Sequence, residues 1–213
     1  MFTLSNPETL FLILPGLILS ITVHEFSHAY TAYMLGDGTA WSQGRVSLNP
    51  VDHFDPYGFL FIILSLASGF GFGWGKPVPV NPAKLRSGKD IILVTAAGPF
   101  SNFFIAFTAA YLHKLLIYLI PVPEAIELFL FYLVVLNVGL GIFNLAPVPP
   151  LDGFTILTGL LPYELAKSLE GMRAYGYIPL IIFIVTPLNK LWFGYMYGIM
   201  NFILTAGDFP MRF

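Results

Sequence analysis

The sequence predicts an all-α polytopic membrane protein, with five or six transmembrane helices and a small β-hairpin or re-entrant element after the first span. Its 213 residues are 56% hydrophobic and only 10% charged, whereas a soluble domain carries about 25% charged residues. Residues 10–35 contain one residue of the Asp, Glu, Lys or Arg types, and residues 91–112 contain none. Apolar runs of about 20 residues have the length that a helix needs to cross a bilayer.

The apolar runs define the order of the elements. They place spans at about residues 10–35, 57–75, 91–112, 125–145, 174–189 and 191–206, within a single membrane-embedded domain over 1–213. Gly36-Asp37-Gly38 ends the first span. Residues 39–48 mix β-branched, aromatic and polar types, which favours a short strand or hairpin. The segment 57–75 is short and rich in glycine, so it either crosses the membrane or is re-entrant.

Prolines shape two further segments. Each proline disfavours helical geometry in the residue before it, so the three prolines in residues 76–82 predict an extended chain there. Pro147, Pro149 and Pro150 predict that residues 144–153 are partly unwound. Such a break is tolerated at membrane depth where it is buried in protein or lines a wet cavity.

Charge and cysteine content exclude several classes of protein. A net charge of −2 gives no basic surface for nucleic acid. The absence of cysteine removes disulfides, thiolate metal sites and cysteine nucleophiles. No Lys or Arg precedes the first apolar run, which argues against a cleaved signal peptide.

The peptide His24-Glu25-Phe26-Ser27-His28 carries the chemistry. Histidines four residues apart lie one turn apart on one face of a helix, so both imidazoles can bind one tetrahedral zinc ion. Glu25 lies beside them, where a carboxylate can take a proton from a water activated by zinc. Ionisable groups in an apolar span are costly unless they face an interior and have a function. A zinc site is the prediction, and a structural histidine pair is the alternative.

A catalytic zinc ion needs a third protein ligand and an open position for water. Asp152 is the leading candidate because it follows the proline-rich break, although Asp152-Gly153 is also typical of an ordinary turn. Glu164 and Glu170 are alternative third ligands in a membrane zinc protease of another kind. A non-enzymatic metal-binding transporter is the alternative from a different functional class.

The other two histidines have simpler interpretations. His113 adjoins Lys114 at the end of a span, which is typical of an interfacial histidine. His53 lies between Asp52 and Asp55 next to a turn, which is typical of a solvated loop. A gating or occluding contact between His53 and the metal is the alternative.

Three motifs follow one another along the chain: H-E-x-x-H at 24–28, G-P-x-x-N at 98–102 and N-x-x-P-x-P-P-L-D-G at 144–153. They resemble the motifs of the site-2 proteases, zinc enzymes that cut peptide bonds inside membranes. R-V-S-L-N-P-x-x-H-x-D-P at 45–56 and G-W-G-K-P-V-P-V-N-P at 73–82 are similar to the small bacterial and archaeal branch without PDZ or CBS domains. The resemblance covers about residues 15–160.

The resemblance implies an intramembrane zinc metalloprotease, with one Zn²⁺ per chain, that hydrolyses peptide bonds of transmembrane substrate proteins. His24, His28 and Asp152 would be the zinc ligands. Glu25 would be the general base that deprotonates water and then the proton donor to the leaving amine.

The resemblance also suggests roles for two asparagines and for the re-entrant segment. Asn144 matches a family asparagine that helps to hold the substrate or the oxyanion, and preorganised donors act strongly in a water-poor site. Asn102 either packs between helices or supports the site from behind. In the family, the helix that carries the two histidines and the helix that carries G-P-x-x-N run antiparallel. This arrangement favours the re-entrant interpretation of residues 57–75. An unwound substrate peptide can add as a strand to residues 39–48 or 76–82.

Location and partners follow from charge and length. With a re-entrant segment, Lys and Arg divide 8 to 2 in favour of the cytoplasmic side, against 7 to 3 if it crosses. We expect a multi-pass protein of a prokaryotic cell membrane whose active site opens toward the cytoplasm. Its expected partners are the lipid bilayer and a transmembrane substrate, with no nucleic acid. A homo-oligomer or a regulatory membrane partner would supply any regulation, because the chain has no room for a PDZ or CBS module.

Overall fold

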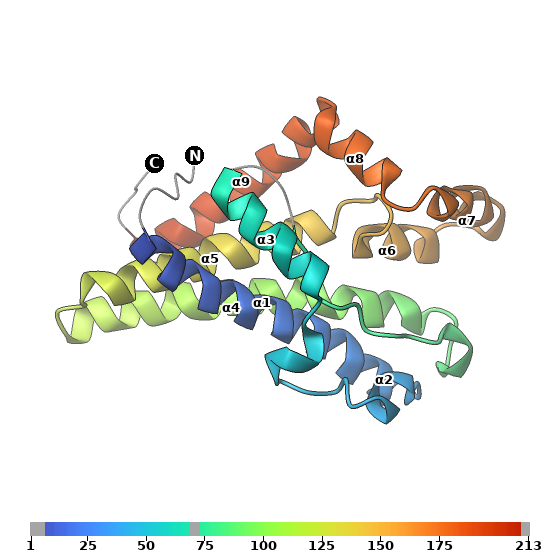
Figure 1. The fold of residues 1–213 in the computed structure, drawn as a ribbon, viewed down its shortest axis with the longest axis horizontal. Coiled ribbons are helices and arrows are strands. Elements are labelled where there is room, and N and C mark those ends of the chain that lie inside the picture. Colours follow the sequence, from blue (N-terminus) through green and yellow to red (C-terminus); the bar gives the residue numbers. More distant parts are fainter. Residues whose placement is uncertain (1–6, 69–72, 210–213) are drawn as a thin grey trace.

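The structure, a computed structural model, describes residues 7–68 and 73–209, and the elements formed by these residues are all helical (Figure 1). The α-helices are α1 (Pro7–Met34), α2 (Thr39–Ser42), α3 (Pro56–Ser68), α4 (Asp90–Leu119), α5 (Glu124–Asn144), α6 (Asp152–Leu160), α7 (Tyr163–Glu170), α8 (Ile178–Val185) and α9 (Leu188–Ala206). Three short 3₁₀ helices are η1 (Pro50–His53), η2 (Pro82–Lys84) and η3 (Gly171–Tyr175).

Helices α1, α4 and α5 form the centre of the molecule and pack against one another (Figure 1). Within the described ranges, these are the three single helices long and apolar enough to cross a membrane. Helix α9 packs on α4 and α5 through a buried apolar cluster that includes Ala106, Val134, Val138 and Ile203. The all-helical membrane class that the composition predicts is therefore confirmed.

The proline-rich breaks are also where the sequence predicts them. Helix α5 ends at Asn144 and α6 begins at Asp152, so the chain between them is unwound as expected. Residues 73–81 form no helix or strand. Helix α4 is longer than the predicted 91–112, because the mostly apolar residues up to Leu119 continue it. Its Lys114 forms an ion pair of 3.2 Å with Asp208 after α9.

The predicted strand or hairpin at 39–48 is wrong. Residues 39–42 form the single helical turn α2, and the described chain contains no strand. Asp37 explains this turn, because its Oδ1 accepts hydrogen bonds from the Thr39 amide (3.0 Å) and hydroxyl (2.5 Å). Burial of Asp37 opposes its ionisation, yet the bonds from Thr39 and the Asn81 amide outweigh burial and hold its pKa below the ordinary value. Gly44, at φ +68°, ends the turn.

The segment 57–75 contains a helix too short to cross a bilayer. Helix α3 has 13 residues, or about 20 Å against a hydrocarbon core of about 30 Å. Part of the segment, residues 69–72, lies outside the described residues. The Trp74 ring then stacks on Phe61, with centroids 5.2 Å apart, and its backbone lies against Gly58. The described ends of the segment therefore lie close together.

The predicted count of five or six spans is not supported at the C-terminal end. Helix α8 has only eight residues and follows η3 at a bend of 90°, so α7–η3 and α8 together give at most a broken span or a re-entrant loop. Helix α9 has 19 residues, but polar residues such as Asn189, Lys190 and Asn201 keep it below the hydropathy of a candidate span. The described chain thus has three candidate spans, or four if the bent pair is one.

Candidate metal centre

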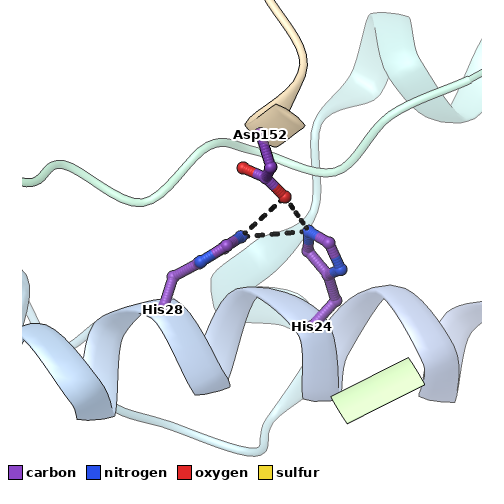
Figure 2. A group of neighbouring side chains, drawn as sticks. All are labelled: His24, His28 and Asp152. Atoms are coloured by element: carbon purple, nitrogen blue, oxygen red, sulfur yellow. Dashed lines mark hydrogen bonds and ion pairs between the residues drawn. The ribbon is translucent and has the colours of Figure 1, made fainter. Parts of the chain in front are cut away.

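Two histidines and one aspartate converge on one point (Figure 2). His24 and His28 lie one turn apart on α1, and Asp152 is the first residue of α6. The Nε2 atoms of the two histidines are 3.0 Å apart. Oδ2 of Asp152 lies 3.2 Å from Nε2 of His24 and 3.3 Å from Nε2 of His28. The unwound segment after α5 is what brings Asp152 back over α1.

The hydrogen bonds behind this group set the direction of the lone pairs. Nδ1 of His28 donates to the carbonyl of Val94 (2.8 Å), and Nδ1 of His24 donates to Oδ1 of Asn102 (2.7 Å). In its neutral form, each imidazole then presents the lone pair of Nε2 to the other two side chains. Oδ2 of Asp152 is buried and has no hydrogen-bond partner among the described residues. Three electron-rich atoms facing one another fit a cation, and two imidazoles plus one carboxylate are typical of catalytic zinc.

Gly98 on α4 makes room for this group. A Cβ atom added there would overlap the His28 ring and lie 2.7 Å from Cε1 of His24. Only a glycine therefore lets α4 approach α1 this closely. The close contact between α4 and the two histidines explains why the first position of the G-P-x-x-N motif is glycine.

Asn102, the last position of the same motif, connects the site to a buried polar network. It is fully buried and donates from Nδ2 to Oδ1 of Asn137 (2.9 Å) and to the Ser20 carbonyl (3.3 Å). Nδ2 of Asn137 in turn donates to Oγ of Ser20 (2.8 Å). The network therefore fixes the His24 ring from α1, α4 and α5 together. Sequence reasoning missed Asn137, although a carboxamide in the uncharged run of α5 was a usable signal.

We expect Asn102→Ala to weaken zinc binding by about 10- to 100-fold, the usual effect of losing a partner that orients a metal ligand. The His24 ring would lose its acceptor, and Asn137 would lose a donor. Zinc affinity of the purified protein, with thermal unfolding measured alongside, checks this. Thr108→Ala on the same helix removes only a bond to the Phe104 carbonyl and serves as the control. Unchanged zinc affinity in folded N102A protein would contradict this role.

Glu25 is next to His24 in the sequence and Asn144 is the last residue of α5, and both side chains are held by other partners. Oε2 of Glu25 accepts a hydrogen bond of 3.0 Å from the Val78 amide. Nδ2 of Asn144 donates to the Leu140 carbonyl of its own helix at 3.0 Å. Both positions come from the sequence motifs, and the Glu25–Val78 bond is a contact that the motifs do not reveal.

The remaining candidates lie outside the metal group. His53 is buried rather than solvated, and its Nε2 donates to the Ser47 carbonyl (2.8 Å). His113 is also buried rather than interfacial, and its Nδ1 donates to the Gly207 carbonyl (2.6 Å). Glu170 forms an ion pair of 2.6 Å with Arg173, and Glu164 is exposed on α7. Of the carboxylates proposed as third ligand, Asp152 is the one that meets the histidines.

The fold and the site together define a class: a helical membrane protein with the ligands of a zinc-dependent hydrolase. Comparisons with known proteins agree. Residues 117–186, which include Asn144 and Asp152, match the family described as Peptidase family M50. "Putative zinc metalloprotease YwhC" of Bacillus subtilis is 39% identical over 184 residues, covering 83% of this chain and 82% of the relative.

Two mycobacterial proteins are more distant relatives. "Putative zinc metalloprotease Rip2" of Mycolicibacterium smegmatis is 28% identical, covering 99% of this chain and 83% of the relative. The protein of that name from Mycobacterium tuberculosis is 27% identical, covering 95% and 80%. The chain belongs to peptidase family M50, the site-2 protease family, whose members are zinc metalloproteases. No solved structure matches it.

Proposed function

We propose that this protein is an intramembrane zinc endopeptidase that hydrolyses peptide bonds of transmembrane substrate proteins. One observation carries the proposal: the buried His24 and His28 of a candidate membrane span converge with Asp152, and Glu25 is next to His24. Family membership supports the metallopeptidase chemistry. The depth of the ligands in an apolar helix supports a substrate that is itself within the membrane.

Glu25 is the general base in this proposal. Zinc, when bound by His24, His28 and Asp152, supplies a Lewis acid that activates water and polarises a carbonyl. The Glu25 carboxylate takes the proton of the attacking water and then delivers it to the leaving amine. Asn144 lies at the end of α5, where its amide would have to exchange its bond to the Leu140 carbonyl for one to the substrate or the oxyanion. Asn102 supports His24 rather than binding substrate in this scheme.

The arrangement of the protein in the membrane is part of the proposal. The described parts of the segment 57–75 support a re-entrant element, since α3 is short and Trp74 lies back against Gly58. The distribution of Lys and Arg then supports a cytoplasmic location for the unwound segment before Asp152. Water reaches the site from that side, and the chain is a single multi-pass domain of a prokaryotic cell membrane. A gating role for His53 would act through its neighbours Arg45 and Ser47.

Metal removal tests this function directly. The purified protein in proteoliposomes, mixed with a single-span model substrate, is expected to cut that substrate, because its ligand set matches catalytic zinc. It should lose cleavage with 1,10-phenanthroline and regain it with added zinc. The non-chelating isomer 1,7-phenanthroline is the matched control. If the protein still cuts the substrate when metal analysis shows that no zinc is bound, the proposal is contradicted. Zinc uptake into vesicles without any cleavage would favour a transporter.

A further inference from the structure

Residues 76–81, called here the strap, cross the active-site helix α1 as an extended segment anchored at three points. The Lys76 amide donates to the His53 carbonyl (2.8 Å), and the Asn81 amide donates to Oδ2 of Asp37 (2.6 Å). Between them, the Val78 amide donates to Oε2 of Glu25 (3.0 Å). The strap is thus fixed to η1 at one end and to the turn after α1 at the other, with the proposed base in the middle.

Arg45 holds the first half of the strap. Its Nη2 donates to the Lys76 carbonyl (2.5 Å), and its Nη1 donates to the Pro77 carbonyl (3.2 Å). Nη2 also lies 3.5 Å from Nδ1 of His53, which is free to accept because Nε2 donates to Ser47. Arg45 is only 5% exposed, and no carboxylate is among its partners in the described chain. A buried cation without a counter-charge is costly, so a function is needed to explain it.

Arg45 and Glu25 both contact the peptide group that joins Pro77 and Val78. The Pro77 carbonyl and the Val78 amide belong to the same planar unit and point in opposite directions from it. Arg45 binds the oxygen end of this unit, and Glu25 accepts from its nitrogen end. A cation on the carbonyl polarises the whole unit and strengthens the bond that its N–H donates. The orientation of the Glu25 carboxylate is therefore coupled to Arg45 through a single peptide bond.

We propose that Arg45 is a positioning residue for Glu25, acting through the strap. The proposal rests on the proposed function, in which Glu25 is the general base. The Val78 amide donates a hydrogen bond to Oε2 of Glu25 and so fixes the plane of the carboxylate. The other oxygen, Oε1, is then held where it can accept the proton of the attacking water. Pro77 and Pro79 lack N–H groups and restrict the strap to extended geometry, which keeps the Val78 amide directed at Glu25. Arg45 itself touches no reacting atom.

The test compares R45A, R45K and R86A with the unmodified protein in proteoliposomes, using a single-span model substrate. Arg86 is an exposed arginine shortly after the strap, so R86A controls for the loss of a charge. We expect R45A to lower kcat by about 10- to 100-fold, the range for small misplacement of a reacting group. KM and bound zinc should stay unchanged. R45K can still donate to one carbonyl and should give an intermediate kcat, and R86A should match the unmodified protein.

Hydrogen–deuterium exchange supplies a readout that does not depend on cleavage. Peptides covering 73–82 should take up deuterium faster in R45A than in R86A, because a strap without the Arg45 bonds holds the Val78 amide less firmly on Oε2 of Glu25. Equal kcat and equal exchange in R45A and the unmodified enzyme would overturn the positioning role alone. Loss of zinc or raised KM in folded R45A would make Arg45 structural and also overturn it. If R45A does not fold, R45K decides by the same criteria. No cleavage by the unmodified protein would overturn the proposed function, and the positioning role with it.

Discussion

Replacing Glu25 with Gln is expected to lower cleavage of a transmembrane substrate by at least about 100-fold while bound zinc stays the same. General base catalysis contributes about 10²- to 10⁴-fold, and a carboxamide cannot take the proton of the attacking water. Its oxygen can still accept from the Val78 amide as Oε2 does now, so the strap should keep its place. Single-turnover cleavage rates in proteoliposomes, with zinc measured in the same samples, check this result.

A matched carboxylate makes this result specific. Glu164 is exposed on α7, and Glu164→Gln removes the same charge without touching the site, so its cleavage rate should equal that of the unmodified protein. Substantial cleavage by E25Q would show that another group takes the proton. Loss of zinc from E25Q would instead mean that Glu25 supports the metal site rather than the chemistry.

Asp152→Ala is expected to have the largest effect on metal binding. It removes one of three converging ligand atoms and leaves two imidazoles, so zinc affinity should fall by more than the 10- to 100-fold that loss of an outer partner costs. Cleavage should be lost with the metal. Metal analysis after equilibration with a competing chelator of known zinc affinity measures the change.

The alternative ligands supply the comparison. Glu164→Ala and Glu170→Ala should bind zinc as the unmodified protein does, because Glu164 is exposed and Glu170 is paired with Arg173. If D152A binds as much zinc as the unmodified protein and either of these variants binds less, the third ligand is a glutamate of α7 rather than Asp152. Undiminished zinc in all three would exclude these three carboxylates as the third ligand.

A group of His24, His28 and Asp152 that could hold one metal ion was predictable because the relevant physics is local. His24 and His28 need only the helical repeat to share a face, and the prolines before Asp152 are enough to indicate a helix break. The strap was predictable as extended chain for the same reason. Its attachment to Glu25 was not, because the bond joins residues 53 positions apart and depends on how α1 and the strap pack.

The errors also have physical causes. Residues 39–48 carry types common in strands, but the Asp37 side chain accepts hydrogen bonds from the amide and hydroxyl of Thr39, the first residue of the short helix α2. Hydropathy alone marked residues 174–206 as two spans, whereas Pro187 separates a short α8 from a longer, more polar α9. His113 appeared interfacial because of Lys114, yet α9 and the residues after it cover the ring. The Asp37 contacts and Pro187 act locally, whereas the cover of His113 comes from residues distant in the sequence.

The hydrogen-bonded chain from Ser20 through Asn137 and Asn102 to His24 has a consequence for assembly. Lipid tails are as apolar as Leu or Val, so apolar side chains alone select weakly among the ways in which three inserted helices can rotate or slide past one another. Buried carboxamides are selective, since a wrong rotation leaves them without partners in hydrocarbon. The network thus favours one rotation and one register of α1, α4 and α5 relative to one another. Because His24 is its last member, competence to bind metal arises only in a correctly assembled bundle.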